Sequence, residues 1–242
     1  MAAHYATKGF VFKREDRSEA DRVFSVFTRD FGRVEIFAKA IRKITSKLKG
    51  GIEIFALSDI EFIQGKNRKT LIEAALAKKF TDISKVPEKI IMAGRVSLLL
   101  DNFIKGQEAD ERIWNLIVDF FEKLSNEKLI FPGQRLYYYF FWNFISALGY
   151  KPELSTCAAC NQALYPATLY FSSNDGGILC QDCFAVKKTG EKIHPDVVKV
   201  LRVMLKNDWD TLLKLKIQKS SQKELEQISE NYYRYLLPGH FS

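Results

Sequence analysis

The sequence has few of the residues and patterns on which enzymes depend. It holds only three histidines, and no Ser-His-Asp set can be assembled from them. The phosphate-binding GxxxxGK[ST], a GxGxxG after a strand and the metalloprotease HExxH are all missing. No carboxylate cluster of the kind that holds two catalytic metal ions is visible either. The sequence therefore predicts a protein that is not an enzyme.

Long apolar runs are also missing. No stretch of the chain is long enough to span a bilayer. Residues 1–7 have neither the basic start nor the apolar run of a signal peptide. We therefore expect a cytoplasmic protein with no membrane partner. The hydrophobic fraction of 47% is ordinary for a globular protein that buries a core.

Cysteine is scarce, but its placement gives the strongest motif in the chain. The four cysteines form two CxxC pairs, Cys157/Cys160 and Cys180/Cys183. This spacing is typical of a four-thiolate zinc site. Two short strands, 169–171 and 178–179, are joined by a turn at 172–177 and would carry the second pair back beside the first. Because four thiolates fill the coordination shell of zinc, we expect a structural ion.

Two alternatives stay open for these cysteines, namely two disulfides or four unrelated buried thiols. A reducing cytoplasm disfavours the disulfides. Asn161, just after the first pair, suits a turn position with positive φ. The zinc site is the interpretation that we carry forward.

Positive charge is concentrated in the first third of the chain. The formal net charge is +8; residues 1–82 hold 17 Lys and Arg against 11 Asp and Glu, and residues 83–242 hold 20 against 18. The first part therefore carries +6 and the second +2. This distribution indicates a surface for a polyanion, with nucleic acid as the leading candidate. Charge that serves only solubility is the alternative.

Short strands with turn signals between them fill residues 5–80. We expect strands at 9–12, 22–28, 33–38 and 52–63, and a strand or a helix at 71–76. Five strands in so short a segment predict a small closed barrel, of which the OB-fold is a common kind. The sequence thus predicts an OB-fold nucleic-acid-binding domain at residues 1–82. Most aromatic residues on these strands belong to the core, and Phe31, in a turn, is the expected exception.

Two loops of this domain contain runs of basic residues with few acidic residues among them. No acidic residue lies between Lys39 and Ile52, and a second basic run follows Gly65. We expect such runs to be flexible unless a polyanion neutralises them. Phosphate binding by these runs would be electrostatic and independent of base sequence. The cations of the two loops are Lys39, Arg42, Lys43, Lys47, Lys49, Lys66, Arg68 and Lys69.

Helical periodicity begins near residue 84. Apolar positions predict helices from about 87, at 110–125, at 134–148, from 195 and at 224–237. The run 137–142 is aromatic all round, which is typical of a helix buried in a bundle. The fold class is thus α+β and multi-domain. An all-α helical domain at 83–242 follows the OB-fold barrel and contains an inserted four-cysteine zinc module at about 154–186.

Several motifs of the chain occur together in one known family. They are Gly149-x-x-Pro152-x-Leu154-x-x-Cys157-x-x-Cys160, Phe171-Ser172, Gly176-Gly177-x-x-Cys180-x-x-Cys183, the segment 26–33, and Ala38-Lys39 with its basic tract. With these motifs the sequence resembles the bacterial recombination mediator family RecO, over nearly the whole chain. The departures are Ala40, where a glycine is common, Ile54-Phe55 in place of a Pro-Phe step, and Asn161 in place of a glycine.

The resemblance implies a DNA-binding recombination mediator in DNA repair. RecO-like proteins bind single- and double-stranded DNA and anneal complementary strands that are coated by single-strand-binding protein. With RecR they help to load RecA, an indirect partner, and they bind the acidic C-terminal tail of single-strand-binding protein. We expect a cytoplasmic protein that associates with the bacterial nucleoid during repair. The DNA-binding residues would be the eight loop cations, with Arg33 at the edge.

Two other functions stay open at this stage. A basic OB-fold with a zinc ribbon is also common in RNA-binding or ribosome-associated proteins, and only RNA offers the 2′-hydroxyl that would distinguish them. A zinc hydrolase or nuclease would need an open position on the metal, which four thiolates do not leave.

Overall fold

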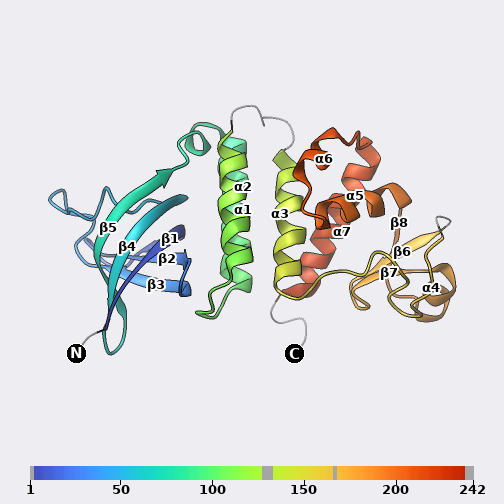
Figure 1. Cartoon of the computed structure of the whole chain (residues 1–242), viewed down its shortest axis with the longest axis horizontal. Helices are drawn as coiled ribbons and strands as arrows, with labels where there is room; N and C mark the ends of the chain where they lie inside the picture. Colours follow the sequence, from blue (N-terminus) through green and yellow to red (C-terminus); the bar gives the residue numbers. More distant parts are fainter. Residues whose placement is uncertain (1–2, 127–132, 166–167, 238–242) are drawn as a thin grey trace. The chain divides into compact units, whose positions relative to one another are not determined.

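The computed structural model describes residues 3–126, 133–165 and 168–237. The chain divides into two compact units, Met1–Gly133 and Gln134–Ser242, and each is considered by itself (Figure 1). The first unit contains the expected N-terminal strands and also the two helices that follow them. The expected division into an OB-fold domain at 1–82 and a helical domain at 83–242 stays a prediction.

Five strands form the sheet of the first unit. They are β1 (Ala3–Asp16), β2 (Arg22–Thr28), β3 (Gly32–Ala38), β4 (Ala56–Gln64) and β5 (Lys69–Lys79). They pair in the order β1-β2-β3-β5-β4, and β1 also pairs with β4, so the sheet closes on itself as a barrel. The expected five-stranded sheet is confirmed, and the ambiguous segment at 71–76 is a strand.

Alternating burial along the strands builds the core inside this sheet. On β3, for example, Val34 and Ile36 are 1% and 0% exposed, whereas the intervening Glu35 faces solvent. This period of two is the geometry of a strand with one packed face and one wet face. The core also takes in Ile41 and Ile52 from the connection between β3 and β4.

Two helices complete the first unit. A short 3-10 turn (Ile83–Lys85) leads into α1 (Pro87–Phe103), and α2 (Glu111–Ser125) follows. The Asp110 carboxylate accepts hydrogen bonds from the first backbone N–H groups of α2, so the helix begins with an N-cap. Phe121 of α2 packs on Phe10 of β1 and on Phe55, which directly precedes β4; the ring centroids lie 4.4 and 5.7 Å away. The apolar face of α2 is thereby buried against the end of the barrel.

The second unit contains five helices and a small sheet among the residues described. The helices are α3 (Gly133–Ala147), α4 (Gln181–Lys187), α5 (Pro195–Leu205), α6 (Trp209–Lys214) and α7 (Lys219–Leu236). The sheet has β6 (Leu169–Ser172) between β7 (Gly177–Leu179) and β8 (Glu191–Ile193). The hairpin of β6 and β7 confirms the strands expected around the cysteines, whereas β8 was not predicted.

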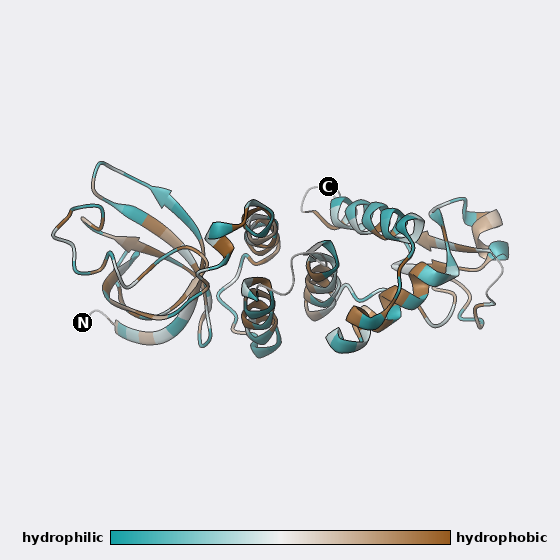
Figure 2. Cartoon of the chain, turned by 90° about the horizontal axis from the view of Figure 1, so that it is seen from above, coloured by the Kyte–Doolittle hydropathy of each residue, from teal (hydrophilic) through white to brown (hydrophobic). Residues whose placement is uncertain are grey.

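The aromatic run of α3 forms the centre of the second unit. Phe140 and Trp142 are 0% exposed, which confirms that the aromatic run belongs to the core. The indole N–H of Trp142 donates to Ser229 Oγ of α7 at 2.9 Å, and its ring stacks on Tyr232. Much of α7 away from this contact is hydrophilic (Figure 2). In the described part of the chain, no helix combines the length and the hydrophobicity needed to cross a membrane.

Candidate metal centre and nucleic-acid interface

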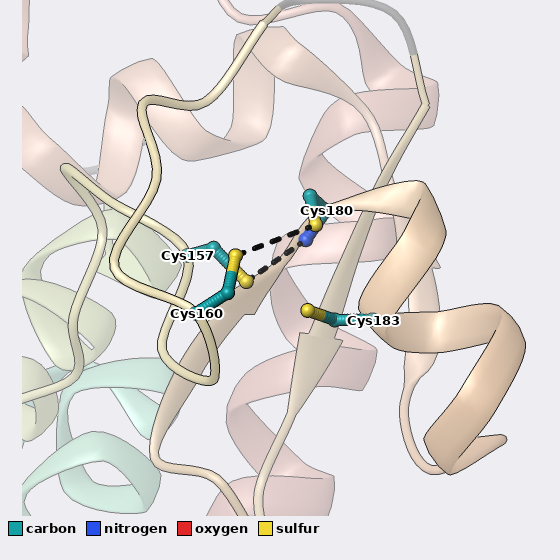
Figure 3. A group of neighbouring side chains, drawn as sticks. All are labelled: Cys157, Cys160, Cys180 and Cys183. Carbon is teal, nitrogen blue, oxygen red and sulfur yellow. Dashed lines mark hydrogen bonds between the residues drawn. The ribbon is translucent and has the colours of Figure 1, made fainter.

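The four cysteines converge on one point (Figure 3). Cys157 and Cys160 lie in a tight loop before β6, and Cys180 and Cys183 lie at the start of α4. Their sulfur atoms all lie within 4.8 Å of one another. The β6–β7 hairpin creates this arrangement, because it returns the chain from the first pair to the second. The CxxC spacing and the turn between β6 and β7 therefore both contribute to bringing the four sulfur atoms together.

The distances suit a tetrahedral ion. With metal–sulfur bonds of about 2.3 Å, the edges of a tetrahedron of thiolates are roughly 3.8 Å long. The sulfurs of Cys160 and Cys180, from opposite pairs, are 3.9 Å apart. All four cysteines are free thiols, so the alternative of two disulfides does not describe this geometry. The cluster is compatible with a structural metal.

Local backbone geometry prepares the first pair. Asn161 has φ of 59°, as expected, and its N–H donates to the Cys157 carbonyl at 2.8 Å. Here a glycine would have avoided the steric cost of positive φ, but asparagine is among the residues that tolerate it best. The N–H of Cys180 points across the site to Cys157 Sγ at 3.4 Å. The second pair thus stabilises negative charge on the first.

The pKa values of two of the thiols are shifted in opposite directions. Burial alone would raise the pKa of Cys157, but backbone N–H groups of Cys180, Cys160 and Ala159 lower this pKa to about 6. Hydrogen bonds with Cys160 and Cys180 raise the pKa of Cys183 to about 12. One thiol therefore ionises readily, while hydrogen bonds with its neighbours hold another protonated. A bound divalent cation would let all four deprotonate.

The module is joined to the helices by aromatic contacts. Phe171 of β6 is 1% exposed and packs edge-on against Trp142 and Tyr232, with centroid separations of 5.9 and 5.4 Å. The guanidinium of Arg202 on α5 donates to the Leu154 carbonyl at 2.9 Å. The cysteine module therefore contacts α3, α5 and α7 of the second unit.

The two basic loops meet at one end of the barrel. β3 and β5 run parallel, with Ile36 opposite Lys69 and Phe37 opposite Thr70. The end of β3, which continues into Lys39, therefore lies beside the start of β5, which follows Arg68. Both Lys39 and Arg68 act electrostatically on Asp21, which agrees with this proximity. The structure thus brings together the beginnings of both cationic runs.

Most of these cations are exposed and have no acidic partner. In the first unit as described, the only one with an ion pair is Arg42, whose Nη1 lies 3.4 Å from Asp16. Lys69 is half-buried and the others are exposed. Unpaired cations of one sign on one surface attract a polyanion. The seven without an ion pair are Lys39, Lys43, Lys47, Lys49, Lys66, Arg68 and Lys69.

The longer loop is a series of turns, and its expected flexibility in the absence of a polyanion stays a prediction. Backbone hydrogen bonds join Lys43 to Ala40, Ser46 to Lys43 and Gly51 to Leu48. Buried Ile41 and Ile52 fix its two ends in the barrel core. A Cβ on Gly51 would lie 1.9 Å from the Ala74 carbonyl oxygen, so the loop also runs directly against β5. Ordered turns reduce the entropy that is lost when the lysines bind a ligand.

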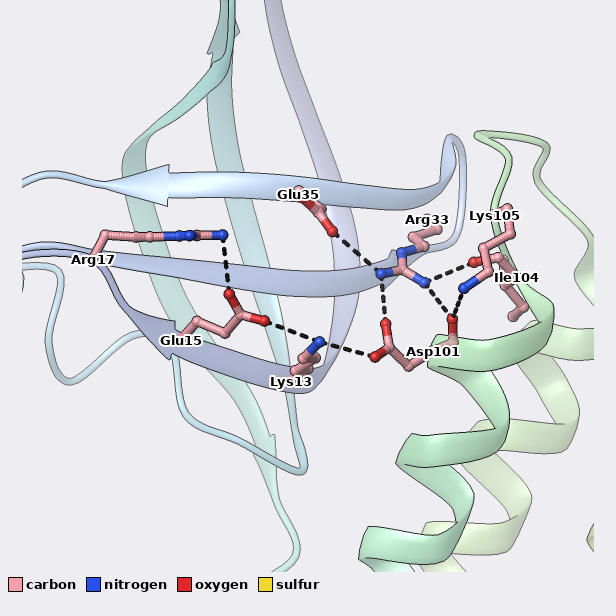
Figure 4. Close-up of polar contacts among 8 residues, drawn as sticks. All are labelled: Lys13, Glu15, Arg17, Arg33, Glu35, Asp101, Ile104 and Lys105. Carbon is pink, nitrogen blue, oxygen red and sulfur yellow. Dashed lines mark hydrogen bonds and ion pairs between the residues drawn. The ribbon is translucent and has the colours of Figure 1, made fainter. Parts of the chain in front are cut away.

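Arg33 lies apart from this exposed set (Figure 4). Its guanidinium donates to the carbonyls of Asp101 and Ile104 at 3.0 and 2.8 Å and to the Asp101 carboxylate at 2.7 Å. Its side chain is only 11% exposed. These contacts join β3 to the C-terminal end of α1, where a cation also suits the helix dipole. The geometry gives Arg33 a structural part and does not support its expected place at the edge of the DNA surface.

Asp101 receives a second cation from β1. Lys13 Nζ lies 2.9 Å from its carboxylate. Partial burial acts to raise the pKa of Asp101, but the hydrogen bonds from Lys13 and Arg33 outweigh it and lower the pKa below its usual value. Strands β1 and β3 are thus held to α1 through one carboxylate.

Four acidic residues of the barrel gather away from the basic runs. Asp59 and Glu61 on β4 lie near Glu73 of β5 and Asp30 of the β2–β3 turn, around a shallow hollow. Glu61 pairs in register with Glu73. These acids lie along the middle of β4 and β5, whereas the basic runs begin at the end of β3. This group of acids is therefore separate from the basic runs, although Asp21 lies beside Lys39 and Arg68 and Asp16 pairs with Arg42.

The sequence did not identify which aromatic residue lies beside the basic loops. Phe31, the expected exposed exception, instead packs on the barrel core with its ring 5.3 Å from that of Tyr5. Phe37 lies on the outer side of β3, and the Arg68 guanidinium carbon lies over its ring at 4.0 Å from the centroid. The alternation of buried Val34 and Ile36 with outward Phe37 is the signal that could have identified it.

Comparisons with known proteins cover both parts of the chain. A family model described as "Recombination protein O N terminal" matches residues 1–80. A second, described as "Recombination protein O C terminal", matches residues 85–242. A protein named DNA repair protein RecO from Dehalococcoides mccartyi is 34% identical over 233 residues, which is 96% of this chain and 90% of the relative.

More distant relatives carry the same name. The DNA repair protein RecO of Roseiflexus sp. is 28% identical over 96% of this chain and 81% of its own length. That of Desulforamulus reducens is 25% identical over 96% of this chain and 90% of its own length. The similarity therefore extends over nearly the whole sequence.

Proposed function

The chain belongs to the RecO family of DNA repair proteins, and from that membership we propose that it is a recombination mediator. It binds single- and double-stranded DNA and anneals complementary strands that single-strand-binding protein covers. With RecR as partner, it helps to load RecA onto that DNA. It acts by holding nucleic acid and breaks no covalent bond. Its place of action is the bacterial cytoplasm, at the nucleoid.

One observation carries the proposal for DNA, namely the exposed, unpaired cations that begin where β3 and β5 meet. Two strands repel each other through their phosphates, and a surface that neutralises both lowers this repulsion and lets the bases pair. Contacts to phosphate are blind to base sequence, which suits a protein that must anneal any sequence. We assign this role to the seven unpaired loop cations and to Arg42, whose ion pair with Asp16 is exposed, and leave Arg33 out.

The barrel itself is an OB-fold in this proposal. Five strands that close through a parallel β3–β5 contact are consistent with that five-stranded Greek-key barrel, which commonly binds single-stranded nucleic acid in its loops and on one face. The names of the relatives, all DNA repair proteins, favour DNA over RNA. The C-terminal tail of single-strand-binding protein would bind the helical part.

The cysteine cluster holds zinc in this proposal. Cys157, Cys160, Cys180 and Cys183 would fill all four positions of the ion, so it has no place for water or substrate. Its part is to hold the module against α3 and α7 through Phe171.

The electrostatic proposal is tested by the dependence of affinity on salt. If about five phosphates are bound, the logarithm of the association constant falls against the logarithm of salt concentration with a slope of about −3.5 on single strands. Replacing Lys39 and Lys43 by Gln should make this slope less steep by roughly 0.7 for each phosphate that the variant no longer neutralises. Replacing Lys8, an exposed lysine paired with Asp59 on the acidic side, by Gln is the matched control. An affinity independent of salt would contradict the proposal.

The proposed activity is tested by strand annealing in the presence of single-strand-binding protein, with and without a zinc chelator. We expect annealing by the intact protein and its loss in the variant with neutralised loops. Chelation should lower the melting temperature of the chain but leave DNA affinity unchanged, because the cysteines and the basic loops belong to different units. A melting temperature unchanged by chelation would contradict the structural role of zinc.

A further inference from the structure

The outer side of β3 bears a pocket that the phosphate-binding role does not use. It is an open hollow of about 540 Å³ between β3, the β4–β5 loop and the connection from α1 to α2, all within the first unit. This size is in the range of small-ligand sites. The residues that matter here are Val23, Phe37, Asn67, Arg68, Lys105 and Gln107.

The floor of the pocket is apolar, although it lies on the wet side of the sheet. Val23 and Phe37 are opposite each other in the β2–β3 register, and both are half-buried. The outward side of an antiparallel sheet normally carries polar residues, and the barrel core lies on the opposite side. An aromatic ring in this position needs another partner.

Arg68 supplies a second flat surface above the floor. Its guanidinium carbon lies 4.0 Å from the centroid of Phe37, which is stacking distance for a cation over an aromatic ring. Arg68 itself is exposed, so the other side of its guanidinium is open to a ligand. Nucleobases stack on arginine planes as well as on aromatic rings, and the phenyl ring below holds this plane in one orientation.

Two amides of the pocket have no partner among the described residues, whereas its one carboxylate, Glu35, pairs with Arg33. Within the part of the chain that the structure describes, the side-chain amides of Asn67 and Gln107 make no hydrogen bond, and both are exposed. Lys69 lies beside them without an ion pair, and Lys105 Nζ is held by the Asp101 carbonyl at 2.6 Å. Amides can pair with the edges of a base, and ammonium groups can pair with its phosphate.

We propose that this pocket binds one unpaired nucleobase, which stacks on the open side of the Arg68 guanidinium with Phe37 beneath it. The proposal rests on the proposed DNA-binding function and adds what phosphate contacts cannot provide. A base inside a duplex has both faces covered by its neighbours, so only a single strand can fill the pocket. The barrel would thereby distinguish strands that await pairing from strands already paired.

The test compares two ligands of equal charge and length, an oligothymidine and an oligomer of abasic sites. Full-length protein binds each in a fluorescence anisotropy titration. Arg68→Lys keeps the positive charge and removes the plane, so the salt slope stays the same. Because the variant loses the stacking surface for the base, we expect about a tenfold loss of affinity for oligothymidine and no loss for the abasic oligomer. Phe37→Leu, which removes the ring and keeps an apolar floor, should act in the same direction.

Arg29→Lys is the matched control, because Arg29 is an exposed arginine on the acidic side of the barrel and should affect neither ligand. Equal affinity of the unchanged protein for both oligomers would overturn the pocket and leave the phosphate surface standing. An equal loss on both oligomers, or none, in Arg68→Lys would also overturn it. Binding of neither oligomer by the unchanged protein would instead refute the proposed function.

Discussion

Replacing Arg33 by Met tests whether this residue supports the fold and does not bind DNA. Methionine keeps an apolar stem over Phe12, whose ring lies 5.4 Å from the guanidinium carbon, and removes every hydrogen bond that the guanidinium makes. We expect the joint between β3 and the end of α1 to weaken, because the side chain is 11% exposed and water cannot fully replace its contacts.

The stability lost in Arg33→Met depends on which acceptors of the Arg33 guanidinium keep another hydrogen-bond donor. The Asp101 carbonyl retains Lys105 and the Asp101 carboxylate retains Lys13, whereas the Ile104 carbonyl loses its side-chain donor. Loss of a charge-assisted hydrogen bond costs roughly 1.5–3 kcal/mol, and breaking a partly buried ion pair adds to it. We therefore expect a loss of about 2–4 kcal/mol in the free energy of opening.

Hydrogen exchange measured peptide by peptide is the suitable assay, because a chain of two units need not unfold in one step. Amides of β3 and of the C-terminal end of α1 should exchange roughly thirty to several hundred times faster in Arg33→Met. The matched control is Arg17→Met, which breaks an exposed ion pair with Glu15 and should change little. A change below about 0.5 kcal/mol would refute the structural role. A large loss of DNA affinity with unchanged exchange would return Arg33 to the DNA surface.

Three further outcomes follow from single positions. Ala40→Gly should stabilise the first unit by about 0.5–1 kcal/mol in urea unfolding, because Ala40 has φ of 53° and glycine avoids the steric cost of that conformation; a loss of stability would contradict this. Gly51→Ala should displace the basic loop and weaken DNA binding, since the new Cβ would collide with the Ala74 carbonyl; unchanged affinity and exchange would show that the loop adapts freely. The lowered pKa of Asp101 contributes stability above the unfolded value of about 3.9, and this stability is lost as pH falls through the lower folded value. Asp101→Asn should therefore weaken the dependence of stability on pH in that acid range. An unchanged dependence would contradict the contribution assigned to Asp101.

Local pattern was sufficient for the elements that depend on neighbours in sequence. Residues 22–28 were predicted as a strand and form β2 with the same bounds. The hairpin around 169–179 and the positive φ of Asn161 also follow from turn chemistry that acts over a few residues. The CxxC pairs could be placed together because the hairpin between them fixes the return of the chain.

Contacts between distant residues could not be read from the sequence. Arg33 counts as one more basic residue until α1 brings Asp101, far along the chain, to its guanidinium. The first strand was expected at 9–12 but runs from Ala3 to Asp16, because β2 and β4 pair with different parts of it. The expected strand at 52–63 begins only at Ala56, since Ile52 is occupied as an anchor of the loop in the core.

The parallel contact that closes the barrel has a mechanical consequence. It consists of two registered residue pairs, whereas the strands on either side pair over longer stretches. The seam is therefore where thermal breathing of the barrel should begin. A sugar-phosphate chain bound by Lys39 after β3 and by Arg68 and Lys69 at the start of β5 would hold these two strands together. At a hundredfold excess over its dissociation constant such a ligand contributes about 2.7 kcal/mol, so DNA would tighten the barrel that grips it.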